Sequence, residues 1–313
     1  MRARGLVGPP VGLTVVVAAA AALASCSSPG DDAAPLPSGV AQDLSAELRQ
    51  DRTQYADRRA TLRVVNGSGR TVTLLGGALD APGYGPSSPD GAPRARTLAP
   101  GAGRDVRLRL GEVDCDAEPP AALTGADAQR TPVATATVRL AAGEASPGST
   151  PAGTAVEVEV VDPLARLAAV HAEACAERLV ASGVALRVGD VRAARVRTPD
   201  GVVDGGRITL AVEPVPGGPD VGLLRVAGTT LLSPASGPAW TGDDLTPDAG
   251  GRVVLDVVPA RCDPHVVAED KRGAFLPVHA EVDGARQPEI YVPMTDEQRA
   301  AVYGLVHDAC GWG

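Results

Sequence analysis

The sequence predicts a mainly β protein with two tandem immunoglobulin-like β-sandwich-type modules, each with a short C-terminal helix and one disulfide. Three observations support this: a repeated segment, short strand-like segments separated by turns, and cysteines at matching places in the two halves. Strands that recur about every 8–12 residues are typical of β-sandwiches. The buried tryptophan of antibody domains has no counterpart in the strands, so the pattern indicates an architecture and no particular family. The helical segments leave a mixed α+β fold as the alternative.

The N-terminal segment has the order of a secretory signal peptide. Two arginines precede an apolar run of about 14 residues (11–24), shorter than the roughly 20 residues that a membrane-spanning helix needs. The run ends in Leu23-Ala24-Ser25-Cys26, which resembles the lipobox of bacterial lipoproteins. The resemblance implies that residues 1–25 are removed and that Cys26 is acylated, which would anchor the protein to the extracytoplasmic face of the cell membrane. The alternative is an ordinary cleaved signal with an incidental cysteine.

Composition supports this interpretation and divides the rest of the chain. Nearly all basic residues are arginine, which suggests a GC-rich genome and a lipoprotein of the actinobacterial type. Residues 26–40 are rich in Pro, Gly, Ser and Asp and predict a flexible stalk. The remaining length suits two domains, which we expect at residues 41–182 and 183–313. The net charge of −9 argues against nucleic acid as a partner and against adhesion to anionic lipid.

The upstream part of each half is strand-like. In the first half, residues 60–65 and 71–75 are apolar and β-branched and flank a Gly/Ser/Asn turn. In the second half, residues 208–212 and 222–226 flank a Pro/Gly-rich turn. Such segments predict short β-strands.

A repeat follows these strands. Residues 98–116 align without a gap on residues 245–263, and eight of the 19 positions are identical. Each copy begins with a Pro/Gly turn, continues with alternating apolar residues as in a strand, and ends at a cysteine, Cys115 or Cys262. We therefore expect the two halves to share one fold.

Each copy is followed by a predicted hairpin. Residues 133–140 and 155–161 form one pair of strand-like segments, joined by a Gly/Ser/Pro-rich stretch. Residues 274–282 and 289–292 form the other pair, joined through the turn Asp283-Gly284.

A helix follows each hairpin. Asp162-Pro163 supplies a cap and a first-turn proline for a helix over about 164–179, and Thr295-Asp-Glu-Gln298 has the form of a capping box for a helix over 299–310. Each helix carries the second cysteine of its half. Four cysteines allow three pairings. The symmetry of the repeat favours Cys115–Cys175 and Cys262–Cys310.

No catalytic or cofactor motif stands out. The chain has no Gly-x-Ser-x-Gly, His-Glu-x-x-His or glycine-rich phosphate loop. His171 and His307 lie close to cysteines, but disulfide sulfurs cannot ligate a metal, so we expect no metal site and histidines on the helix surface. His265 follows Cys262 in Cys262-Asp-Pro-His265, but Asp-Pro is a common start of a turn and does not indicate a metal site. The acidic segment 241–248 could hold calcium only weakly and is interpreted as a solvated turn.

Two aromatic residues in loops are candidate contact residues, Trp240 and Tyr84. For Trp240 the alternative is a side chain folded back on its own module. The sequence thus predicts a non-catalytic binding or structural module of the cell envelope, with an unidentified envelope protein as partner and no cofactor. The alternative is a small-molecule binding lipoprotein with a cleft between the modules. An envelope enzyme has the least support.

Overall fold

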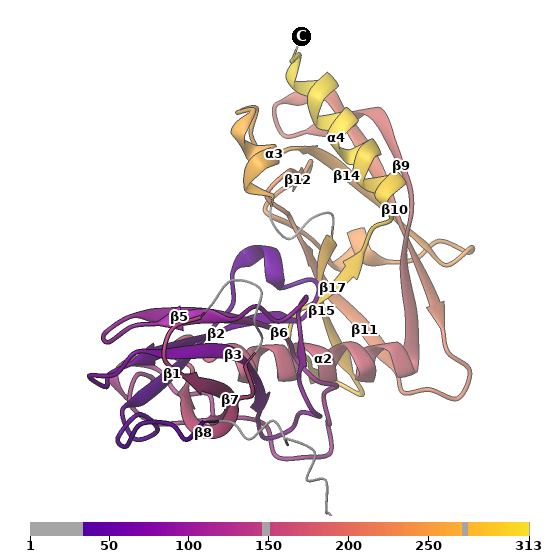
Figure 1. Ribbon diagram of the computed structural model, residues 1–313. Helices are drawn as coiled ribbons and strands as arrows, with labels where there is room; N and C mark the ends of the chain where they lie inside the picture. Colours follow the sequence, from indigo (N-terminus) through magenta and orange to yellow (C-terminus); the bar gives the residue numbers. More distant parts are fainter. Residues whose placement is uncertain (1–33, 146–150, 271–274, 313) are drawn as a thin grey trace, which may run out of the picture. The chain divides into compact units, whose positions relative to one another are not determined.

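The protein is mainly β, as the sequence predicts, and its strands form several sheets (Figure 1). The computed structural model describes residues 34–145, 151–270 and 275–312. The predicted signal segment 1–25 and Cys26 lie outside these ranges. Within them, no helix has both the length and the apolar character needed to cross a membrane.

The first half forms one eight-stranded sheet in the order β4-β6-β2-β1-β8-β7-β3-β5. Neighbouring strands are antiparallel except β1 and β8, which run parallel, with Ala46 opposite Val160. Inward side chains alternate along β2 as expected for a strand with one buried face. The strands are β1 (Leu44–Arg49), β2 (Arg59–Asn66), β3 (Val72–Asp80), β4 (Ser88–Pro89), β5 (Arg96–Leu98), β6 (Gly103–Arg109), β7 (Ala134–Ala142) and β8 (Thr154–Val161).

The turn after β2 separates strands that do not pair with each other. β2 pairs with β1 and β6, whereas β3 pairs with β5 and β7. Asn66 is fully buried at this point, and its side-chain amide donates to the carbonyl oxygens of Arg70 and Leu98. These bonds satisfy a buried polar group and tie the turn to β5.

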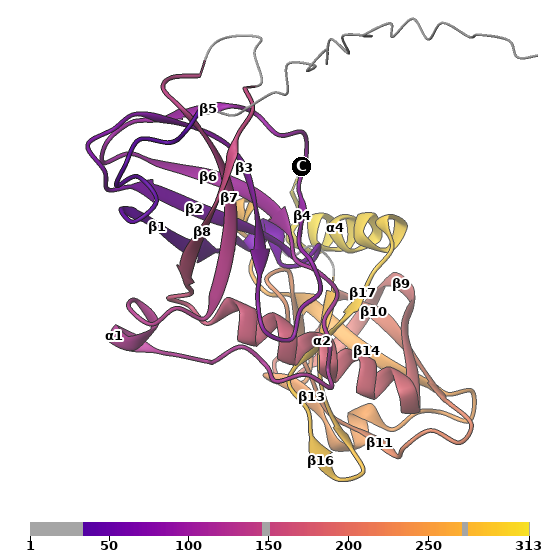
Figure 2. The ribbon, with the colours of Figure 1, turned by 60° about the horizontal axis from the view of Figure 1, so that its bottom comes forward.

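The second half forms two sheets. One has the order β12-β14-β10-β9; the other has the order β13-β11-β15-β16, with β17 also paired to β15. β9 and β10 form a long hairpin (Figure 2). The strands are β9 (Val184–Thr198), β10 (Gly201–Pro214), β11 (Val221–Ala227), β12 (Leu232–Pro234), β13 (Ala239–Thr241), β14 (Arg252–Pro259), β15 (Phe275–Val282), β16 (Ala285–Arg286) and β17 (Ile290–Pro293).

The strand pairs predicted after each repeat are present. β7 pairs with β8, and β15 pairs with both β16 and β17. Two clusters of buried apolar residues accompany the two halves, one within residues 40–167 and one within residues 176–306. Short helical turns occupy connecting segments: η1 (Arg52–Gln54), α1 (Gly125–Ala128), η2 (Gly242–Leu245) and α3 (His265–Glu269).

The two longer helices follow the predicted positions but differ in how they start and end. α2 (Arg166–Gly183) starts two residues later and ends about four residues later than predicted, and it leads directly into β9. Asp162 stabilises the first turn of α2, because the Asp162 carboxylate accepts a hydrogen bond from the backbone amide of Leu167 at 2.8 Å. α4 (Asp296–Cys310) begins with the predicted capping box and ends at Gly311, whose left-handed backbone suits glycine.

The disulfides are those that the repeat predicts. Cys115 is bonded to Cys175, and Cys262 to Cys310. Each joins the segment after a repeat strand, β6 or β14, to the helix that follows the hairpin. The first bond closes the longer loop, and it ties α2 to the first half.

Replacing both Cys115 and Cys175 with Ser should destabilise the protein. The bond spans 60 residues, and the loop-entropy model assigns a loop of this length about 4 kcal/mol of unfolding free energy. Urea denaturation of the variant, followed by circular dichroism, measures the loss. The Cys262→Ser/Cys310→Ser variant, with a separation of 48, is the matched comparison. An unchanged unfolding midpoint would show that α2 is held without the bond.

Candidate functional site

Three adjoining cavities share their lining residues and form what we call the Tyr291 recess. Their volumes are about 70, 590 and 260 Å³. Tyr291 lines all three, and six residues line two of them: Tyr55, Arg166, Glu173, Thr230, Phe275 and Glu289. The main walls are α2, the loop between β1 and β2, and the strands β15 and β17; residues 227–230, at and after the end of β11, add a further part.

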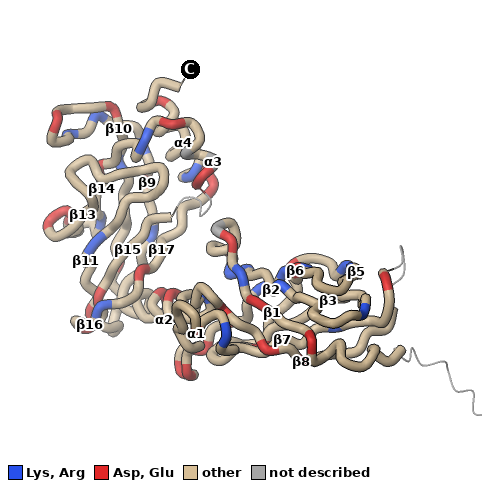
Figure 3. The backbone as a smooth tube through the Cα atoms, turned by 90° about the vertical axis from the view of Figure 1, so that its left-hand side faces the viewer, with Lys and Arg blue, Asp and Glu red and all other residues tan. Residues whose placement is uncertain are grey.

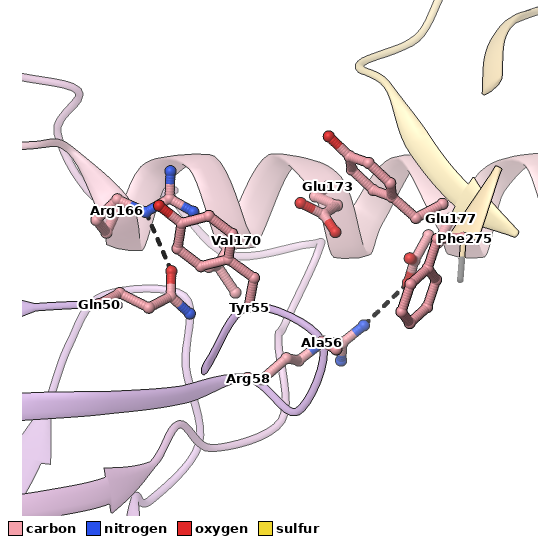
Figure 4. A pocket seen from close by; sticks show the side chains of 10 residues that line it. Gln50, Tyr55, Ala56, Arg58, Arg166, Val170, Glu173, Glu177 and Phe275 are labelled. Carbon is pink, nitrogen blue, oxygen red and sulfur yellow. Dashed lines mark hydrogen bonds and ion pairs between the residues drawn. The ribbon is translucent and has the colours of Figure 1, made fainter. Parts of the chain in front are cut away.

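One stripe of α2 forms the first wall. Arg166, Val170, Glu173 and Glu177 are spaced so that they share one side of the helix, and they face the recess (Figure 4). Ala176 and Val180, on a neighbouring side of the helix, are buried in the core of the second half. α2 therefore contributes both to this core and to the recess.

The loop between β1 and β2 forms the second wall and presents Tyr55. Two buried glutamines hold it: Gln50 donates to the carbonyl oxygen of Arg59 at 3.0 Å, and Gln54 donates to the hydroxyl of Thr61 at 3.0 Å. Gln54 also accepts from the amide of Asp51 in a capping box. The loop is therefore ordered by its own hydrogen bonds.

Arginines connect this loop to α2. The Nε of Arg166 donates to Oε1 of Gln50 at 3.0 Å, and its guanidinium lies 4.3 Å above the ring of Tyr55 (Figure 4). Arg58 donates to Glu177 at 3.1 Å. Arg58 also has a left-handed backbone, with φ of +49°, which costs a non-glycine residue roughly 1–2 kcal/mol. Strain of this kind is concentrated at functional sites.

The outward faces of β15 and β17 form the third wall. Leu276 and Val278 point into the core, so the alternate residues Phe275 and Pro277 face outward, as does Tyr291 opposite Pro277. Glu289 is oriented by its neighbours: its Oε2 lies 3.0 Å from Nε2 of His279, and its Oε1 accepts from the hydroxyl of Tyr291.

The recess offers binding contacts. Three aromatic rings supply apolar faces, and arginine and glutamate side chains supply hydrogen-bond donors and acceptors that are already oriented by their partners. Among its described lining residues there is no serine or cysteine with a base beside it. In the part of the chain that the structure describes, no three His, Cys, Asp or Glu side chains are placed to hold a metal ion.

Trp240 is not a contact residue, which corrects the prediction from its loop sequence. It lies on β13 opposite Val226, is 3% exposed and belongs to the core of the second half. The pairing of β13 with β11 turns the indole inward. The alternative of a side chain folded back on its own half therefore describes Trp240.

Tyr84 is also structural. It is largely enclosed, and its hydroxyl donates to the carbonyl oxygen of Leu167 in α2 at 2.6 Å. Burial raises the pKa of Tyr84 well above its ordinary value. The residue thus binds α2 to the first half and is not available as an exposed contact.

His171 corrects the expectation of surface histidines, since it is 5% exposed. Its Nε2 donates to the carbonyl oxygen of Asp114 at 3.0 Å. Gly83 makes room for the ring, because a Cβ at this position would lie 2.7 Å from the imidazole. His307, near the end of α4, is exposed as expected.

The acidic segment 241–248 is a capped turn. Asp248 accepts from the backbone amides of Arg252 and Gly250, and these bonds lower its pKa. The Asp248 carboxylate therefore stabilises its own turn.

Sequence reasoning missed Tyr55, Phe275 and Tyr291. A usable signal was present, because the chain has seven aromatic residues and these three lie next to loops or at strand ends. Their convergence depends on contacts between distant segments, which the spacing along the chain does not reveal.

Asp270 lines one cavity of the recess, and burial raises its pKa. A hydrogen bond from Tyr303, at 3.4 Å, opposes this shift without cancelling it.

Asp270→Asn should raise the melting temperature at pH 7. A carboxyl group whose folded pKa is raised contributes its stability below its ordinary pKa of about 4 and loses it as pH rises through the folded value. The amide cannot ionise, so the gain should shrink at pH 3. Thermal unfolding at both pH values tests this. Asp200→Asn, in the exposed turn after β9, is the control; an equal gain there would contradict the burial argument.

Comparison with known proteins gives little. No protein-family model and no curated protein matches the chain. Three solved structures show a weak likeness. The D0-D1 domain of intimin is 12% identical, with a TM-score of 0.15, over 80% of this chain and 98% of that chain. Red sea bream transglutaminase is 11% identical, with a TM-score of 0.20, over 81% and 32%. CBD12 from CALX1.2 is 9% identical, with a TM-score of 0.18, over 76% and 79%. Scores this low carry no argument about fold or function.

Proposed function

We propose that this protein is a lipid-anchored extracytoplasmic lipoprotein that binds a cell-envelope partner through the Tyr291 recess and does not catalyse a reaction. The observation that carries the proposal is the convergence of Tyr55, Phe275 and Tyr291 at one site, in a chain with 2% aromatic residues. Aromatic side chains dominate binding energy at interfaces because they offer large rigid apolar faces beside a polar group.

Preorganisation supports binding at the recess. Arg58 is paired with Glu177, and Arg166 is held by both Gln50 and the Tyr55 ring. A partner therefore meets side chains that are already ordered, which reduces the entropy lost on association. The chemistry suits a polar partner with at least one apolar or planar face.

We also propose that the two halves, residues 41–182 and 183–313, are tandem immunoglobulin-like modules that arose by duplication. The order β4-β6-β2-β1 in the first half corresponds to β12-β14-β10-β9 in the second, and β8-β7-β3-β5 corresponds to β17-β15-β11-β13. A helix and a disulfide follow in the same places. Strand sets of this kind resemble the two sheets of an immunoglobulin-like sandwich.

The anchor rests on the lipobox-like Leu23 to Cys26. An acidic chain has little attraction for anionic membranes, so a lipid on Cys26 accounts for retention at the cell membrane. Several acyl chains on one residue hold far more firmly than one. The composition favours an actinobacterial lipoprotein.

A small molecule is the second candidate occupant. The largest of the three cavities of the recess, about 590 Å³, falls within the range of roughly 300–1,000 Å³ typical of ligand pockets. Its residues come from both halves, including Arg166 and Tyr291. An envelope protein and a solute differ in how much surface they cover, so mutation of exposed residues outside the recess distinguishes them.

Tyr55→Ala and Tyr291→Ala should each weaken partner binding by about thirtyfold, because truncating an aromatic hot spot typically costs 2 kcal/mol or more. Cross-linking in the native envelope identifies the partner, and its affinity for the variants is then measured. Val254→Ala, an exposed apolar residue on β14, is the control. Equal capture by the wild type and both recess variants would place binding elsewhere.

Cys26→Ala should move the protein from the membrane fraction to the soluble fraction, because the proposed lipid is attached to the Cys26 thiol. Fractionation and immunoblotting measure this, with Ser27→Ala as the control. Membrane retention of Cys26→Ala would contradict the acyl anchor. That result would not bear on the proposed binding at the Tyr291 recess.

A further inference from the structure

A second cavity, remote in sequence from α2 and β17, lies in the first half. It has a volume of about 210 Å³ and lies between β3 and β6, which are near opposite ends of the strand order, and residues 89–96, which run from the end of β4 to the start of β5. Arg94, Arg96 and Arg107 line it, so we call it the arginine-rimmed cavity. Figure 3 marks basic residues at β5 and β6.

These three arginines carry unmatched positive charge. All three are exposed, and none forms an ion pair with another residue that the structure describes. Two aspartates also line the cavity, but Asp105 pairs with Arg63 at 3.1 Å, and Asp90 lies 3.6 Å from both Arg59 and Arg109. The carboxylates are thus matched by arginines outside the cavity. An acidic protein therefore carries a local excess of guanidinium groups here.

The floor beneath the arginines is apolar. Leu74 and Leu75 are buried, Val106 is partly buried, and Gly76 and Gly77 leave the adjoining wall without side chains. At Gly76, where φ is +151°, an added Cβ would meet no atom within 4 Å, so open space adjoins the backbone. Guanidinium groups above an apolar floor suit a ligand with an anionic end and a hydrocarbon end.

The connecting segment is held at both ends. The amide of Asp90 donates to the carbonyl oxygen of Arg107 at 3.0 Å, and Arg96 lies opposite Leu74 in the β5–β3 pair. The cavity is therefore built by backbone pairing before any ligand arrives.

We propose that the arginine-rimmed cavity binds a small anion, a phosphate ester or a carboxylate, that carries a short hydrocarbon chain. Guanidinium groups match both anions with paired hydrogen bonds. The volume is below that of pockets for drug-sized ligands, so the ligand is small or inserts only one end. This site is separate from the Tyr291 recess and does not depend on the function proposed for it.

Isothermal titration calorimetry of the full-length protein with butyl phosphate tests the proposal. Butyl phosphate should bind one to one and at least about tenfold more tightly than inorganic phosphate, because each buried methylene adds to affinity. Butanol, which lacks the anion, should give no saturable heat. No saturable binding of butyl phosphate, or equal binding of inorganic phosphate, would overturn the proposal.

Arginine variants locate the site. Arg94→Gln, Arg96→Gln and Arg107→Gln should each weaken butyl phosphate binding by about threefold to tenfold, and the triple variant should abolish it. Arg130→Gln is the matched control, because Arg130 is also exposed and is not among the residues that line the cavity. An equal loss in Arg130→Gln would mean diffuse charge attraction and refute a built site. Circular dichroism confirms that each variant is folded.

Vesicles distinguish two sources of the same chemistry. Displacement of butyl phosphate by phosphatidylglycerol vesicles, but not by phosphatidylcholine vesicles, identifies a lipid headgroup as the occupant. If butyl phosphate binds but phosphatidylglycerol vesicles do not displace it, the occupant is a free anion. Either result supports the site, provided that the arginine variants no longer bind butyl phosphate.

Discussion

The attachment of helix α2 to the first half is the constraint on which the rest of the structure depends. The bond between Cys115 and Cys175, the hydroxyl of Tyr84 and the imidazole of His171 fasten it there. Leu167 reaches the first core, while Ala176 and Val180 lie in the second. Because no loop separates α2 from β9, the helix passes its orientation directly to the strand that follows.

The Tyr291 recess is a consequence of this attachment. Arg166, Glu173 and Glu177 of α2 face the recess and the β1–β2 loop, while Ala176 and Val180 pack into the second core. Arg58 and Arg166 then pair with that helix and that loop, which places Tyr55 beside the helix. The same contacts that stabilise the junction therefore build the recess.

The predictions that were wrong share a cause. Trp240 and His171 were assigned to the surface from their neighbours in sequence, a Pro/Gly-rich loop and a polar helix. Cross-strand pairing with β11 buries Trp240, and the missing side chain of Gly83 allows His171 to enter. The arginine-rimmed cavity also depends on distant pairing, because β5 returns to β3 after β4 has joined β6. Local composition carries none of this information.

The sequence by itself determined the β class, the positions of the helices after each hairpin and the pairing of four cysteines. These follow from short-range patterns, namely alternation, capping residues and a repeated segment whose symmetry selects one connectivity. Only the tertiary structure decided which strands are neighbours, which aromatic residues meet and which arginines form no ion pair with a described carboxylate. The physical reason is that each depends on packing between segments far apart in the chain. There, adding a single Cβ or shifting a strand by one residue changes which side chains meet.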